Sequence, residues 1–118
     1  MRLILLLLAI ASAAPALAQQ PLPPLARESM PSLGCYKDTS VLDLDGHLER
    51  SAQNTPQRCI AICREKGFRY AAVQYGESCL CGNSYGRYGP ATNCDMQCTG
   101  AALTCGGYAA NEVFSTGN

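Results

Sequence analysis

Eight cysteines in a chain of 118 residues are the feature that most limits what this protein can fold into. An even number of cysteines in a short exported chain indicates a framework of disulfides. A small domain buries too little apolar surface to offset the entropy lost on folding, and each disulfide adds about 2–4 kcal/mol. The count alone leaves the pairing open. The cysteines are Cys35, Cys59, Cys63, Cys79, Cys81, Cys94, Cys98 and Cys105.

Residues 1–18 have the composition of an export signal. Arg2 supplies a positive start, residues 3–10 form an apolar run, and Ala16-Leu17-Ala18 is a small-x-small cleavage site. The run is shorter than the about 20 residues that a membrane-spanning helix needs, so an uncleaved membrane anchor is the less favoured alternative. We expect cleavage before Gln19, and a secreted protein, extracellular or cell-wall associated, with no membrane contact afterwards.

The remaining chain divides into a leader, one domain and a short tail. Residues 19–32 are proline-rich and lack cysteine, which is typical of a flexible leader. No internal repeat is visible, so residues 33–115 are predicted to form a single domain, followed by a tail at 116–118. Nine basic and nine acidic side chains give a formal net charge of zero. A neutral chain offers no basic face for nucleic acid or anionic lipid, which favours neutral partners.

A metal site is the alternative use of the cysteines. Cys94 and Cys98 are separated by three residues, a spacing that zinc ligands tolerate. Export into an oxidising compartment favours disulfides over thiolate ligands. We therefore expect no metal and no cofactor.

The clearest element is a helix that follows Thr55. Thr55 can cap it, Pro56 suits its first position and Gly67 can end it. Cys59 and Cys63 then lie one turn apart on the same face. Two cysteines in that arrangement cannot comfortably bond each other, so each must reach another element.

Two strands are predicted directly after this helix. Residues 68–75 are rich in aromatic and apolar side chains, residues 76–78 suggest a turn, and a second strand begins at Cys79. Cys79 and Cys81 share a face of that strand because side chains alternate along it, so this pair can meet the helical pair across a helix–sheet interface. We also expect a first strand at 34–38, a turn at 43–46, a helical turn at 94–98, a tight turn at 106–107 and a closing strand at 112–115.

The cysteines and the residues between them form a recognisable set of motifs. The matching pieces are Gly34-Cys35-Tyr36 with Asp38, Cys59-x3-Cys63-x3-Gly67, Tyr70-Ala71 with Gln74-Tyr75-Gly76, Cys79-x-Cys81-Gly82, Cys94-x3-Cys98-x-Gly100, and Cys105-Gly106-Gly107 ahead of Val113-Phe114. Over residues 33–114 the chain resembles the WSC domain, the cysteine-rich module of fungal cell-wall stress sensors and of secreted carbohydrate-active proteins.

The resemblance implies a fold, a pairing and a ligand. The fold is α+β, a small disulfide-rich domain in which one main helix packs on a short antiparallel sheet and four disulfides hold the two together. The ligand is polysaccharide, with cell-wall glucan of the β-glucan type favoured. The resemblance also ties the helical cysteine pair to the strand pair, and we add two further bridges. The pairs that we favour are Cys35–Cys94, Cys59–Cys79, Cys63–Cys81 and Cys98–Cys105.

Tyrosines and polar residues around the second strand are candidates for holding a sugar. Sugar C–H groups stack on aromatic rings, and hydroxyls pair with carboxylates and amides. The turn at 75–77 and the glycine- and tyrosine-rich loop at 83–88 are predicted to form one shallow sugar-binding face. Its candidate residues are Tyr75, Glu77, Asn83, Tyr85, Arg87 and Tyr88. Five other residues have structural interpretations: Tyr36, Tyr70 and Tyr108 as framework residues, and Gln74 with Asp38 as groups that satisfy buried backbone donors.

Catalysis finds little support in the sequence. His47 is the only histidine, and it lies near Asp43 and Asp45, two acids that are interpreted as solvated turn residues rather than a glycosidase pair. The cysteine pair at 79 and 81 could suggest redox exchange, yet all eight cysteines fit structural bridges. We therefore predict a binding module and not an enzyme.

A protein partner is the alternative to a sugar. Modules related to the WSC domain occur in animal receptors, where the partner need not be a carbohydrate. A secreted protein–protein interaction module, acting as an effector or binding a receptor, would use the same scaffold. Depletion of the purified protein by insoluble polysaccharides separates the two hypotheses.

Overall fold

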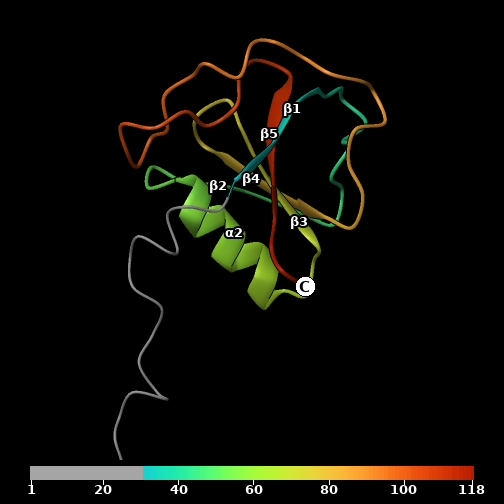
Figure 1. Ribbon diagram of the computed structural model, residues 1–118. Helices are drawn as coiled ribbons and strands as arrows, with labels where there is room; N and C mark the ends of the chain where they lie inside the picture. Colours follow the sequence, from blue (N-terminus) through green and yellow to red (C-terminus); the bar gives the residue numbers. More distant parts are fainter. Residues whose placement is uncertain (1–30) are drawn as a thin grey trace, which may run out of the picture.

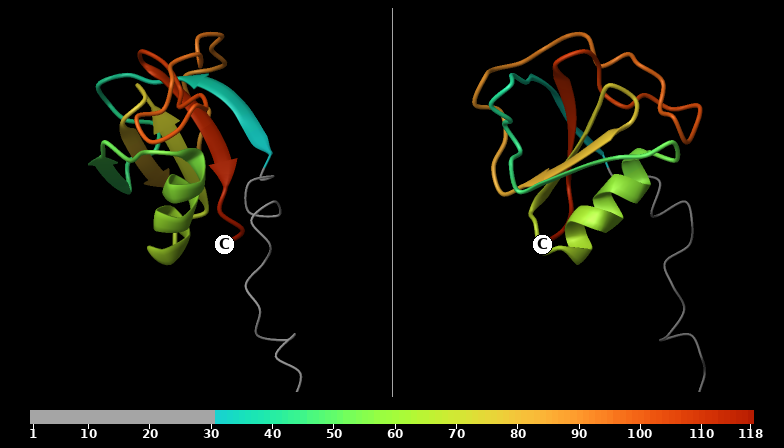
Figure 2. Two further views of the ribbon diagram at one scale, coloured as in Figure 1. Left: turned by 90° about the vertical axis from the view of Figure 1, so that its left-hand side faces the viewer. Right: turned by 180° about the vertical axis from the view of Figure 1, so that it is seen from behind.

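The computed structural model describes residues 31–118, so the predicted export signal and most of the leader lie outside the described residues. One helix packs on a five-stranded antiparallel sheet, which confirms the predicted α+β class (Figures 1 and 2). The strand order is β1-β5-β3-β4-β2. The elements are β1 (Ser32–Lys37), β2 (His47–Arg50), α2 (Pro56–Glu65), β3 (Tyr70–Gln74), β4 (Ser78–Gly82) and β5 (Ala110–Ser115).

The helix begins and ends where the sequence predicts. The Thr55 hydroxyl accepts a hydrogen bond of 3.1 Å from the Arg58 amide, which satisfies one of the free amides of the first turn. Pro56 occupies the start of α2, where a missing amide hydrogen does no harm. Gly67, just beyond the helix, has a φ of 86°, a conformation that glycine adopts without strain.

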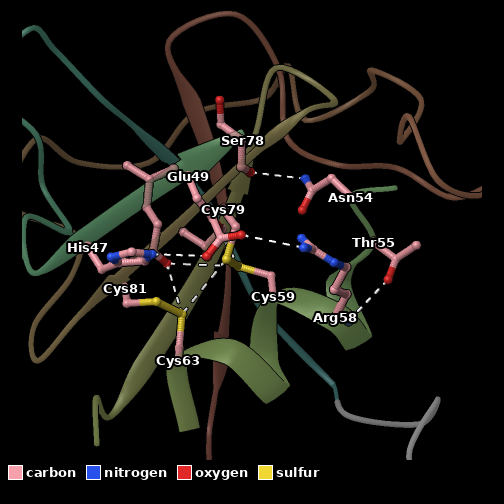
Figure 3. The surroundings of a disulfide bond; sticks show 12 residues. His47, Glu49, Asn54, Thr55, Arg58, Cys59, Cys63, Ser78, Cys79 and Cys81 are labelled. Atoms are coloured by element: carbon pink, nitrogen blue, oxygen red, sulfur yellow. Dashed lines mark hydrogen bonds and ion pairs between the residues drawn. A yellow bond between two sulfur atoms is a disulfide. The ribbon is translucent and has the colours of Figure 1, made fainter. Parts of the chain in front are cut away.

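Four disulfides hold the domain together, and they join the four pairs that we favoured from the sequence. Two of them fix α2 to β4, because Cys79 and Cys81 project from one face of the strand toward the helix (Figure 3). Cys94 and Cys98 are each bonded elsewhere, so neither offers a thiolate to zinc. The pairs are Cys35–Cys94, Cys59–Cys79, Cys63–Cys81 and Cys98–Cys105.

Both faces of the sheet are covered. Side chains that alternate along β3 and β4 divide between them: Ala71 and Val73 pack with the disulfides under α2, whereas Ala72 and Leu80 pack on the opposite face. On that opposite face Leu44 is fully buried, and the loops between the strands cover it. The sheet thus has a disulfide-filled core on one side and an aliphatic and tyrosine-lined core on the other.

Two local predictions are wrong. The segment 94–98 is not a helical turn, because it pairs with the chain around Thr104 instead: Gln97 forms a β-bridge with Thr104, and the Met96 amide donates to Gly106 O at 2.9 Å. The tight turn lies at Tyr108–Ala109 rather than at the preceding glycines, since Gly107 and Ala110 exchange backbone hydrogen bonds of 3.0 and 3.2 Å around it.

The first and last residues of the folded domain also differ from the predicted bounds. Ser32, assigned to the leader, belongs to β1. Thr116, assigned to the tail, is buried, and its carbonyl accepts a hydrogen bond of 2.7 Å from Arg64 Nε on α2. Strand β2 was not predicted; it pairs with β4, with His47 opposite Cys81.

Candidate functional site

A pocket of about 400 Å³ opens at the end of the sheet where β3 turns into β4. Four segments that are distant in sequence form it: the loop after β1, the end of β2, the β3–β4 turn and the turn before β5. A volume of this order is typical of small-molecule sites. The lining residues are Asp38, Thr39, Arg50, Gln74, Tyr75, Glu77, Ser78, Tyr108 and Ala109.

Two tyrosines form the aromatic part of this pocket. The rings of Tyr75 and Tyr108 meet edge to face, with centroids 6.4 Å apart and planes at 70°. Their side chains are well exposed, at 52% for Tyr75 and 77% for Tyr108. Tyr75 was a predicted site residue, whereas the interpretation of Tyr108 as a framework residue is wrong. Its position at the tip of a two-residue turn places the ring outside the core.

Backbone strain is concentrated at the same place. Within residues 31–118, Tyr75 and Ala109 are the non-glycine residues with a left-handed backbone, with φ values of 53° and 47°. That conformation costs roughly 1–2 kcal/mol for a residue with a side chain. The Tyr75 amide donates to Gly107 O at 3.3 Å, and the Gly76 amide donates to Cys105 O at 2.9 Å, which holds the two turns together. Strain of this kind is commonly found at ligand sites.

A buried polar network lies under the pocket. Asp38 Oδ1 accepts hydrogen bonds of 2.9 Å from the Thr39 and Asp43 amides, so the interpretation of Asp38 as an acceptor for backbone donors is confirmed. Asp38 Oδ2 accepts from Gln74 Nε2 at 2.9 Å. Gln74 also donates to Asn111 Oδ1 at 3.0 Å, so its partners are side chains rather than backbone groups.

The rim of the pocket carries charge. Arg50 Nε lies 3.8 Å from Glu77 Oε1; the Arg50 side chain is largely exposed and the Glu77 side chain is half-exposed. Such an exposed pair contributes little to stability, which leaves both groups available to a ligand. Glu77 was predicted as a site residue. Arg50 was missed because strand β2, which positions it opposite Ser78, was not predicted.

Tyr85, another predicted site residue, is packed instead. Its ring lies edge-on to those of Tyr36 and Tyr70, with centroids at 5.2 and 4.7 Å. Desolvation raises the pKa of the Tyr85 hydroxyl, and its two tyrosine neighbours add to the effect. The framework interpretation of Tyr36 and Tyr70 is confirmed. Tyr70 opens β3 and Tyr75 follows its end, so Tyr85 and Tyr75 belong to opposite ends of that strand.

The other three predicted residues make contacts within the fold and do not line the pocket. Asn83 Oδ1 accepts a hydrogen bond of 3.0 Å from the Arg69 amide. The Arg87 guanidinium lies 4.9 Å from the centre of the Tyr88 ring and donates to Leu42 O. The Tyr88 hydroxyl donates to Val41 O at 2.7 Å. Loop 83–88 is thus fastened to residues 41–43, and the single face predicted from Tyr75 to Tyr88 is divided.

The Asp43 side chain is hydrogen-bonded to loop 83–88. The carboxylate is buried and accepts a hydrogen bond of 2.6 Å from the Gly86 amide. Asp45, in contrast, is exposed. The interpretation of both acids as solvated turn residues is therefore right for Asp45 and wrong for Asp43.

A second polar cluster joins β2 to α2 above the disulfides (Figure 3). His47 Nε2 lies 3.0 Å from Glu49 Oε1, and Arg58 Nη2 lies 3.5 Å from Glu49 Oε2. The hydrogen bond from His47 lowers the pKa of Glu49 against the opposing effect of burial, and Arg58 assists. His47 is thus paired and half-buried rather than solvated. The nearby sulfurs of Cys59, Cys63 and Cys79 lie within 4.8 Å of one another, but all are in disulfides and cannot ligate a metal.

Among residues 31–118, no helix has the length and apolar character needed to cross a membrane.

The chain is a small α+β module held together by four disulfides. One helix packs on a five-stranded sheet, and a pocket lined by two exposed tyrosines opens at the end of that sheet. The family model of the WSC domain matches residues 32–107. The chain therefore belongs to the WSC family, as its motifs predicted.

Several animal proteins are similar to the chain over this domain. Xylosyltransferase oxt of Drosophila melanogaster is 37% identical over 92 residues, which covers 73% of the chain and 10% of that protein. Kremen protein 1 of Homo sapiens is 38% identical over 91 residues, 72% of the chain and 19% of that protein. Kremen protein 2 of Homo sapiens is 40% identical over 81 residues, 64% of the chain and 18% of that protein. The chain thus spans about a tenth to a fifth of these relatives, and the shared part is the WSC domain.

Proposed function

We propose that this chain is a secreted, non-catalytic module that binds cell-wall polysaccharide of the β-glucan type in the pocket lined by Tyr75 and Tyr108. The observation that carries the proposal is the exposure of these two rings above a set of polar groups. Aromatic rings stack on the C–H faces of sugars, and polar neighbours orient the hydroxyls. The formal net charge of zero suits a neutral polymer.

The proposed site combines predicted and newly found residues. Tyr75 and Glu77 remain from the sequence-based set, and Tyr108 and Arg50 join them. Glu77 and Arg50 supply an acceptor and donors at the rim, where sugar hydroxyls need both. In this proposal Asn83, Tyr85, Arg87 and Tyr88 belong to the framework that holds the neighbouring loops.

The polar groups of the pocket support binding rather than hydrolysis. A glycosidase needs two carboxyl groups that are free to act on the scissile bond. The pocket has two, Asp38 and Glu77, but three hydrogen bonds already engage both oxygens of Asp38. The xylosyltransferase relative has an enzyme's name, yet it shares only the WSC domain with this chain. In that relative, a sugar-binding module would assist an enzyme that acts on sugars.

A depletion assay tests the proposal. The purified protein is incubated with insoluble β-glucan, chitin and cellulose, and the protein left in solution is measured. We expect depletion by β-glucan, abolished in Tyr108→Ala and retained in Leu103→Ala. Leu103 is a matched control because its side chain is 47% exposed and lies outside the pocket. Absence of depletion on every polymer would instead favour the protein-binding alternative.

A further inference from the structure

We infer that the pocket takes a single, twisted glycan chain, such as an isolated β-1,3-glucan strand, and not the flat surface of a crystalline polymer. The inference rests on the proposed function and adds the physical form of the ligand. It is drawn from the angle between the two tyrosine rings and from the fixed turns that carry them.

The two rings form a corner instead of a platform. Their planes are 70° apart, so a flat sheet of sugar rings lying on Tyr75 would meet Tyr108 obliquely, and the reverse holds for a sheet lying on Tyr108. Flat polymer surfaces are best bound by coplanar rings, because each ring then stacks on a separate sugar. A corner offers stacking in two directions to one chain.

The most exposed ring also stands in the way of a flat surface. Tyr108 is 77% exposed at the tip of its turn, while Tyr75 is 52% exposed. At the rim, the Arg50 side chain is largely exposed and the Glu77 side chain is half-exposed. A broad surface would touch these projections before it reached the pocket, whereas a narrow chain can enter between them.

The two turns that carry the rings are fixed relative to each other. Tyr75 and Ala109 both have left-handed backbones, and the Tyr75 amide is hydrogen-bonded to Gly107 O. Gly106 lies so close to β3 that an added Cβ would be 2.2 Å from Val73 O. The disulfide between Cys98 and Cys105 closes the same loop. These backbone contacts fix the points from which the two side chains project, and the edge-to-face contact between the rings favours the angle at which they meet.

The shape of the polymer decides which glycan suits this corner. Chains of cellulose and chitin in crystals are flat ribbons whose sugar faces are coplanar. A β-1,3-linked chain winds, so that neighbouring sugars turn their faces in different directions. Two rings 70° apart can each stack on a different sugar of such a chain. Binding to a preformed corner costs little ordering of the protein, which favours useful affinity from a small contact area.

The test compares soluble and crystalline ligands for the purified protein. Calorimetric titration uses a linear β-1,3-glucan hexasaccharide, and depletion assays use microcrystalline cellulose, crystalline chitin and the same two polymers after swelling to an amorphous state. We expect measurable hexasaccharide binding, weakened about tenfold or more in both Tyr75→Asn and Tyr108→Ala and unchanged in Leu103→Ala.

The outcomes separate the inference from the proposed function. Hexasaccharide binding with greater depletion by amorphous than by crystalline polymer supports the inference. Depletion by crystalline polymer that equals or exceeds depletion by the amorphous form overturns the inference and leaves the proposed function standing. Absence of binding to every saccharide overturns both. A hexasaccharide affinity that Tyr108→Ala does not change shows that the corner is not the site.

Discussion

Gln74 Nε2 donates a hydrogen bond of 2.9 Å to Asp38 Oδ2 and thereby joins the end of β3 to the loop that follows β1. Asp38 is the centre of this connection, because its other oxygen accepts from two backbone amides of the loop. The pair lies in the wall of the pocket between Tyr75 and Tyr108. The same hydrogen bonds that complete the fold therefore hold one side of the proposed binding site.

Replacement of Asp38 should destabilise the domain. Asp38→Ala leaves the Thr39 and Asp43 amides and Gln74 Nε2 without their acceptor. The hydrogen bond of the Asp43 amide is buried and the other two are partly buried, and an unpaired buried donor costs about 1–3 kcal/mol, with incomplete additivity. We expect a loss of about 2–4 kcal/mol in the free energy of unfolding, measured by urea denaturation. Asp45→Ala is the matched control, since Asp45 is exposed in the same loop, and it should change stability by less than about 0.5 kcal/mol. Equal losses in the two variants would contradict the network.

The Tyr75 side chain should lower the stability of the domain while it contributes to binding. Its left-handed backbone disfavours a bulky residue, while asparagine adopts that conformation readily. Tyr75→Asn should therefore be at least as stable as the parent protein and more stable than Tyr75→Ala, yet bind glucan poorly. Thermal unfolding and the hexasaccharide titration measure the two properties on the same samples. A variant that unfolds more easily than Tyr75→Ala would refute the strain argument.

Glu49 and Glu112 should change the free energy of unfolding in opposite directions as the pH changes. The pKa of Glu49 is lowered, first by the His47 hydrogen bond, so its contribution exists above the unfolded pKa of about 4.3 and is lost as pH falls through the folded value. Desolvation raises the pKa of Glu112, and the Thr104 hydrogen bond lowers it by a smaller amount. The free energy of unfolding should therefore fall as pH rises through the raised pKa of Glu112 in the folded protein.

Glu49→Gln and Glu112→Gln test these two directions of the pH dependence. At pH 7, relative to the parent protein, Glu49→Gln should be less stable and Glu112→Gln more stable, and both differences should shrink toward pH 3. Urea unfolding between these pH values measures them, with Glu65→Gln, at an exposed position on α2, as the control. Differences of the same sign for Glu49→Gln and Glu112→Gln would contradict the assignment.

The disulfides should contribute unequally. Cys35–Cys94 spans 59 residues and Cys98–Cys105 spans 7. The entropy of the closed loop gives about 4 kcal/mol for the first and about 2 kcal/mol for the second. Replacement of each pair by alanine, with denaturation measured under oxidising conditions, should reproduce that order. A larger loss for the short loop would show that packing of the buried Cys98 and Cys105, rather than loop entropy, sets the order.

The elements that sequence predicted well are those whose signals are local. Thr55, Pro56 and Gly67 define a helix through the chemistry of its ends, and the spacing of Cys59 and Cys63 indicates the face that meets the sheet. Strand β2 was missed because its four residues are mostly polar and it depends on pairing with β4, a partner that no local pattern reveals.

The site was only partly predictable because the decisive contacts are long-range. Tyr85 and Tyr108 both lie beside glycines in loops, and nothing local distinguishes them. The Tyr85 ring is half-buried because it packs against Tyr36 in β1 and Tyr70 in β3. Tyr108 is exposed because Gly107 and Ala110 close a turn beneath it. Arg50 reaches the pocket only through the unpredicted strand β2.

A residue-resolved NMR titration with the β-1,3-glucan hexasaccharide shows directly whether carbohydrate binds in the pocket lined by Tyr75 and Tyr108. We expect the backbone amide signals of residues lining the pocket, Gln74, Tyr75, Glu77 and Tyr108 among them, to shift progressively and saturate. Signals of loop 83–88 should stay in place. Shifts centred on Tyr85 and Tyr88 with the pocket unaffected, or no shifts at saturating sugar, would rule out this pocket as the binding site.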